Sequence, residues 1–228
     1  RNGSIWANCM WLKGVVMKAH YNGLIPRNPF IQFHISPNVK EREYLTEDEL
    51  KAVMTHEFAD SKLAYIRDIF IFASFTALSF VDIQELTNDN IVEVNGEKWI
   101  LSKRHKTKVA FQVKLLDIPL QIVERYRPMQ KDNRIFPGLN YWSICKPLKR
   151  MIKECGITKS ISFHCSRHGF ATLALSKGMP IESVSRVLGH TNIVTTQIYA
   201  KITTQKLDND LTMFGDKLSK TFNGITMS

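Results

Sequence analysis

The stretch LGHTNIVTTQIYAKI, residues 188–202, is the most informative segment of this chain. Apolar side chains before it have helical spacing over 181–188. Gly189 is suited to end that helix, because glycine readily adopts the left-handed backbone of a helix C-cap. His190 would then lie on the loop just beyond the helix, and Tyr199 follows nine residues later. The segment therefore predicts a helix that ends at Gly189, with His190 on the loop that follows and Tyr199 shortly after it.

A second short motif, HCSR, places His164 and Arg167 three positions apart. On a helix such residues are neighbours, about 5–6 Å apart at Cβ, so both side chains can face one site. A guanidinium grips two phosphate oxygens at once, and a histidine donates to oxygen or moves protons. Tyr199 can act as a covalent nucleophile, although its free pKa of about 10 means that it needs a base or cationic surroundings.

The rest of the chain indicates a mostly α-helical domain with a small three-stranded antiparallel sheet. Asn95-Gly96 lies between two strand-like runs, which is a strong hairpin signal, and a third strand alternates from Val109 to Leu115. A capping-box pattern begins at Thr46. Helices are expected at 5–22, 46–58, 61–78, 81–86, 119–128, 140–155, 163–177, 181–188 and 193–200.

In this order, His164-x-x-Arg167, Leu188-Gly189-His190 and Tyr199 resemble the signature of the tyrosine recombinase (phage integrase) family. HKTKVAFQVKL (105–115) is similar to the family's second and third strands, with Lys106 at the catalytic lysine. The resemblance covers roughly 25–205, and in character the chain resembles integrases of conjugative transposons and related bacterial mobile elements.

The resemblance implies a domain organisation. Residues 1–25 would be the C-terminal helix of a truncated core-binding domain, since the chain begins without Met, and 26–45 would be a linker containing NPF. Residues 46–205 would form the catalytic domain. The amphipathic tail, 206–228, would dock on a neighbouring protomer or pack on its own domain.

The resemblance also implies a mechanism. Tyr199 would attack a DNA phosphate to form a 3′-phosphotyrosyl link, while Arg167 holds the non-bridging oxygens. Lys106 would protonate the leaving 5′-oxygen, and His164 and His190 would position the phosphate and handle protons. No metal or cofactor is expected.

One position departs from the family pattern. Family members usually carry an arginine where Thr76-Ala77-Leu78-Ser79 ends in serine, although Asp82 matches the supporting acidic position. A serine cannot supply a bidentate cation. Three explanations remain open: another arginine, Arg67 or Arg104, replaces it; the site works with fewer cations; or the chain binds DNA without cutting it.

Charge and composition agree with a nucleic-acid partner. The formal net charge is +10, and Lys103, Arg104 and Lys108 could reach DNA phosphates. Double-stranded DNA with recombination or attachment sites is the expected partner, bound by a homo-tetramer with possible DNA-bending or excision factors. No 18-residue apolar run is present, so no membrane association is expected, and location is expected to be the bacterial cytoplasm at the nucleoid. The competing functions are a type IB topoisomerase and a non-cleaving DNA-binding regulator.

Overall fold

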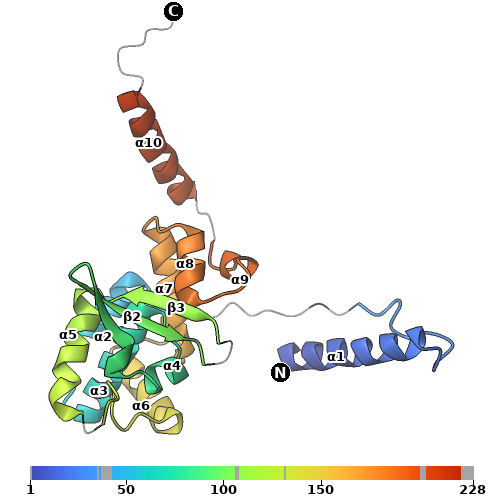
Figure 1. The fold of residues 1–228 in the computed structure, drawn as a ribbon, viewed down its shortest axis with the longest axis horizontal. Coiled ribbons are helices and arrows are strands. Elements are labelled where there is room, and N and C mark those ends of the chain that lie inside the picture. The colour runs from blue at the N-terminus through green and yellow to red at the C-terminus, as the bar shows by residue number, and fades with distance from the viewer. Residues whose placement is uncertain are drawn as a thin grey trace, which may run out of the picture. The chain divides into compact units, whose positions relative to one another are not determined.

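The computed structural model describes residues 2–34, 36, 43–105, 108–130, 132–200 and 204–221 (Figure 1). The chain separates into two compact units, residues 1–42 and residues 43–228. The first unit contains α1 (Asn2–Tyr21), which ends in a turn where Gly23 has a φ of 71°. None of the described helices combines the length and apolarity needed to cross a bilayer.

The second unit is built around α3 (Ser61–Thr76), which packs against four other helices. The sequence IFIFASFT at its C-terminal half is apolar around the whole helix, and a helix of that kind must be buried on all sides. Phe70 and Phe72 are fully enclosed. The helices on α3 are α2 (Glu47–Thr55), α5 (Asp117–Tyr126), α6 (Tyr141–Glu154) and α7 (His164–Ser176).

The predicted three-stranded antiparallel sheet is confirmed, in the order β1-β2-β3 (Figure 1). Asn95 and Gly96 both have positive φ, 54° and 79°, as the tight turn between the first two strands requires. Phe111, Val113 and Leu115 are buried on one face, as their alternation predicted. The strands are β1 (Ile91–Val94), β2 (Glu97–Lys103) and β3 (Ala110–Lys114).

The remaining elements are short, apart from the last helix. They are α4 (Phe80–Gln84), the 3-10 turns η1 (Asn88–Asn90) and η2 (Arg127–Met129), α8 (Ile181–Leu188), α9 (Val194–Gln197) and α10 (Thr204–Thr221).

The expected helix over 193–200 is too long, because α9 ends at Gln197. Beyond it the backbone continues in tight turns: the N–H of Tyr199 donates to the carbonyl of Thr196, three residues back. Tyr199 therefore lies just outside α9. The helix expected from Pro119 begins earlier, at Asp117, because a proline in the first helical turn removes only an N–H that has no partner there.

Candidate active site

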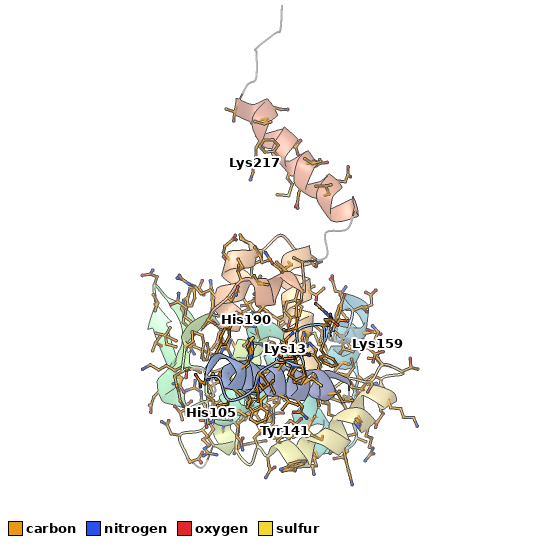
Figure 2. All side chains as sticks on the ribbon, turned by 90° about the vertical axis from the view of Figure 1, so that its right-hand side faces the viewer. Lys13, His105, Tyr141, Lys159, His190 and Lys217 are labelled. Atoms are coloured by element: carbon orange, nitrogen blue, oxygen red, sulfur yellow. The ribbon has the colours of Figure 1, made fainter. Side chains whose placement is uncertain are left out.

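The candidate site is assembled from the N-terminal end of α7, the C-terminal end of α8 and the β2–β3 connection. α8 packs against α7, α9 and β3, so these segments meet although they are far apart in sequence (Figure 1). Gly189 ends α8 with a φ of 63°, the left-handed C-cap that the sequence predicted. His190 follows directly on the loop, where Figure 2 labels it.

Arg167 is held at the centre of this assembly by two backbone carbonyls. Its Nη1 donates to the Ala77 carbonyl at 2.9 Å, and its Nη2 donates to the Leu188 carbonyl. Burial, and next the positive charge of Arg104, lower the pKa of Arg167 to about 10. Arg167 therefore remains a cation at neutral pH, fixed between the α3–α4 junction and the end of α8.

Ser79 stands at the α3–α4 junction as the N-cap of α4. Its Oγ donates to Asp82 Oδ2 at 2.7 Å and accepts from the Asp82 N–H, which forms a capping box. Burial alone would raise the pKa of Asp82, but hydrogen bonds from the His105 N–H, Arg104 and Ser79 hold it below its ordinary value. Asp82 is therefore a buried carboxylate ion.

Arg104 follows β2 and is only 5% exposed. Its Nη1 donates to Asp82 Oδ2 at 2.8 Å, and its Nη2 donates to the Val187 carbonyl at 2.5 Å. The guanidinium carbon lies 4.0 Å from the centroid of the Phe111 ring. The other arginine considered for this role, Arg67, is used elsewhere: it donates to Asp68 and to the His56 carbonyl.

His190 is a neutral imidazole in this setting. Burial, and next the charge of Arg167, lower its pKa to about 4. Its Nδ1 lies 2.8 Å from the hydroxyl of Thr196, a residue that is fully buried in α9. Sequence reasoning did not single out Thr196, and its only signal was a small polar residue between His190 and Tyr199.

Tyr199 lies against α7 of the same chain. Its ring centroid is 5.1 Å from that of His168, and His168 in turn packs edge-on against His164 at 4.6 Å. Tyr199 also borders the small apolar cluster that includes Ala171 and Leu188. Its charged form would interact with Arg167, which is one residue before His168. His168 is thus the side chain that the Tyr199 ring packs against.

The structure describes two of the three lysines predicted for the site. Lys106 lies outside the described residues. Lys103 and Lys108 are exposed on either side of it, at the end of β2 and before β3. Hydrogen bonds between Arg104 and the backbones of Lys108 and Val109 close this connection. The exposed Lys103 and Lys108 therefore lie on either side of a connection that begins with the buried Arg104.

Two guanidiniums and a neutral imidazole lie at the C-terminal end of α8, and the buried carboxylate of Asp82 offsets part of their charge. The Tyr199 ring packs on α7 through His168. Such a site favours an anion with several oxygens, such as a phosphate. No group of three histidine, cysteine or acidic side chains in the described segments is arranged to hold a metal ion.

Comparison with known proteins gives a consistent result. The model of the phage integrase family matches residues 43–206. Tyrosine recombinase XerA of Pyrococcus horikoshii is 33% identical over 177 residues, which cover 72% of this chain and 58% of the relative. Tyrosine recombinase XerD of Listeria innocua is 26% identical over 204 residues, 82% of this chain and 67% of the relative. The chain thus spans under two thirds of the length of the first of these relatives.

Solved structures share the fold at lower sequence identity. The Tn1549 transposon integrase, in complex with a circular intermediate DNA, aligns with a TM-score of 0.74 and 18% identity, over 89% of this chain and 76% of that one. The XerH site-specific recombinase, in a post-cleavage complex with a palindromic difH substrate, aligns with a TM-score of 0.64 and 22% identity, over 80% of this chain and 56% of that one.

Proposed function

Because the chain belongs to the phage integrase family, we propose that it cleaves and rejoins DNA through a covalent 3′-phosphotyrosyl link at Tyr199. The observation that carries this proposal is the position of Tyr199, whose ring packs against His168 and whose charged form would interact with Arg167 of the same chain. A phenol within the field of a fixed guanidinium suits attack on a phosphate.

The proposed reaction is a transesterification. The Tyr199 oxygen bonds to phosphorus, the bond to the 5′-oxygen breaks, and the phenolic proton leaves through a nearby base. Arg167 offsets the charge of the non-bridging oxygens in the transition state. Lys106 protonates the 5′-oxygen, and His190, neutral at pH 7, is able to accept or donate a proton. The exchange conserves the phosphodiester energy, so rejoining needs no external energy source.

The substrate and assembly are part of the same proposal. We infer double-stranded attachment sites of a mobile element, bound by four copies of the chain through a Holliday junction, with integration or excision as the outcome. Relatives whose structures contain DNA support this choice of substrate. Residues 1–25 are proposed to belong to a core-binding domain that, with residues 26–45 as the linker, would close on the duplex opposite residues 46–205; residues 206–228 form the proposed tail.

A suicide duplex, nicked beside the cleavage site, tests the proposal. The short fragment that carries the released 5′-hydroxyl diffuses away after attack, so a covalent protein–DNA adduct accumulates and is visible on a denaturing gel. Tyr199→Phe is expected to abolish the adduct, whereas Tyr44→Phe, a partly exposed tyrosine, should keep it. Tight binding without an adduct would instead favour a DNA-binding regulator. Relaxation of supercoils without recombination would favour a type IB topoisomerase.

A further inference from the structure

Ser79 lacks the positive charge that a phosphate site of this kind would use. The Asp82 carboxylate, which binds the Ser79 hydroxyl, also binds the guanidinium of Arg104. We propose that Arg104 supplies the second guanidinium that contacts the scissile phosphate, reaching the site from the β2–β3 connection. This inference rests on the proposed function, because it assigns a catalytic residue to the same reaction.

The first support is the anchoring of Arg104 by Asp82. Asp82 lies at the start of α4, three residues after Ser79, and accepts hydrogen bonds from Ser79 Oγ, from Arg104 Nη1 and from the His105 N–H. One carboxylate therefore fastens the β2–β3 connection to the α3–α4 junction. The Arg104 guanidinium therefore shares an acceptor, Asp82 Oδ2, with the hydroxyl of Ser79.

The second support is the relation of Arg104 to Arg167. Their Nη2 atoms donate to consecutive carbonyls at the end of α8, those of Val187 and Leu188. A Cβ at Gly189, the next residue, would lie only 2.9 Å from Arg104 Nε. The two arginines thus converge on the same helix end.

The third support is the charge of the site. Two largely buried guanidiniums face one buried carboxylate, Asp82, and Arg104 acts with burial to lower the pKa of Arg167 and of His190. Arg104 Nε is itself buried without a hydrogen-bond acceptor among the described residues. Buried charges in proteins are normally compensated. A phosphodiester, with its anionic oxygens, would supply the missing negative charge.

The test compares Arg104→Ala and Arg104→Lys with the intact chain on the suicide duplex. Loss of one preorganised donor slows catalysis by roughly 10²–10³-fold, so we expect about that loss for alanine. Lysine should restore only part of the rate, because it keeps the charge and loses the fork geometry. Lys114→Gln, which removes a partly exposed cation paired with Glu97 at the far end of β3, is the matched control and should leave the rate unchanged.

A purely structural role for Arg104 must be separated from contact with phosphate. The same variants are therefore assayed on a duplex whose scissile phosphate is a methylphosphonate, which has lost one anionic oxygen. If Arg104 offsets that charge, the rate ratio between the intact chain and Arg104→Ala shrinks by tenfold or more on the neutral substrate. If Arg104→Ala only damages the structure, it will be slower than the intact chain by the same factor on both duplexes. That result would overturn the inference.

Relocating the cation provides an independent readout. Ser79→Arg added to Arg104→Ala is expected to recover at least tenfold of the lost rate. The inference is wrong if Arg104→Ala, shown to be folded by thermal unfolding and to bind the duplex normally, cleaves within about threefold of the intact chain. Failure of the intact chain itself to form a Tyr199 adduct would count against the proposed function instead.

Discussion

Gly189 combines two requirements at a single residue. It ends α8 in the left-handed conformation, with a φ of 63°, and its missing side chain leaves space for the Arg104 guanidinium. Gly178, after α7, has a φ of 88° but open space around it. The two glycines therefore separate the effect of backbone conformation from the effect of crowding the site.

Gly189→Ala is expected to impair cleavage more than stability. Each alanine, at 189 or at 178, should cost about 1–2 kcal/mol of unfolding free energy, since a side chain in the left-handed region is disfavoured by that amount. Only Gly189→Ala should also displace Arg104 and slow adduct formation by about tenfold or more. Urea denaturation measures the unfolding free energy, and the adduct assay measures cleavage. Equal cleavage by Gly189→Ala and Gly178→Ala would show that a side chain at position 189 does not displace Arg104.

His190 should make stability depend on pH. Its pKa is about 4 in the folded chain against about 6.5 when unfolded, so between these values the unfolded state binds more protons. Stability is thus complete above pH 6.5 and falls as the pH drops toward 4, by at most about 3 kcal/mol. His190→Gln should flatten this part of the curve of unfolding free energy against pH. An unchanged slope would place the imidazole in a more solvated setting.

At the scale of elements, α3 and α5 are joined by a buried carboxylate. Asp68, which is 3% exposed, accepts hydrogen bonds from Arg67 at 2.9 Å, Arg125 at 2.7 Å and the Tyr126 hydroxyl at 2.8 Å. Burial and the charge of Asp68 raise the pKa of Tyr126 well above its ordinary value, so the phenol stays a donor. Arg67 is thus a structural arginine of this junction.

Removing that carboxylate should be costly. Asp68→Ala leaves the Tyr126 hydroxyl and Arg67 Nε without their acceptor, and breaking such a buried pair typically costs about 3–5 kcal/mol. Glu124→Ala, which breaks exposed pairs with Lys98 and Arg127, should cost about 1 kcal/mol or less. The midpoint and slope of urea unfolding provide the comparison.

The short α9 segment should matter for activity through Thr196. Thr196→Val keeps the shape but removes the hydroxyl that meets His190 Nδ1 at 2.8 Å. We expect a loss of about 1 kcal/mol in stability and a several-fold slower cleavage, because His190 loses its fixed orientation. Thr195→Val, at the neighbouring exposed position, should change neither. Identical kinetics for the two valine variants would argue against this role.

Sequence patterns were reliable where local chemistry decides the structure. The Asn95-Gly96 turn, the capping box at Thr46 and the left-handed C-cap at Gly189 all follow from the conformational preferences of those residues. The end of α9 did not follow, because it depends on burying Thr196 beneath His190. The choice between Arg67 and Arg104 also depends on tertiary contacts, which only the folded chain brings together.

On the scale of the whole molecule, the net charge of +10 should govern DNA affinity. Counterion release makes the logarithm of the binding constant fall linearly with the logarithm of salt concentration, by about 0.9 per phosphate contact. Lys103→Gln and Lys108→Gln should each reduce that slope by about 1. Lys98→Gln, at the opposite end of β2, should leave it unchanged. Fluorescence anisotropy between 50 and 200 mM salt measures these slopes, and about 6 phosphate contacts would change the affinity by about 10³-fold over that range. Equal slopes for all three variants and the intact chain would contradict the prediction.

The serine that caps α4 has a practical consequence for anyone sorting recombinase genes into active and defunct copies. A filter that demands a basic residue just before α4 would class this chain as inactive, although the β2–β3 connection brings Arg104 to the same carboxylate, Asp82. Surveys of mobile elements should therefore inspect the two sites jointly, and treat a serine there as inactivating only when the residue aligned with Arg104 is also neutral.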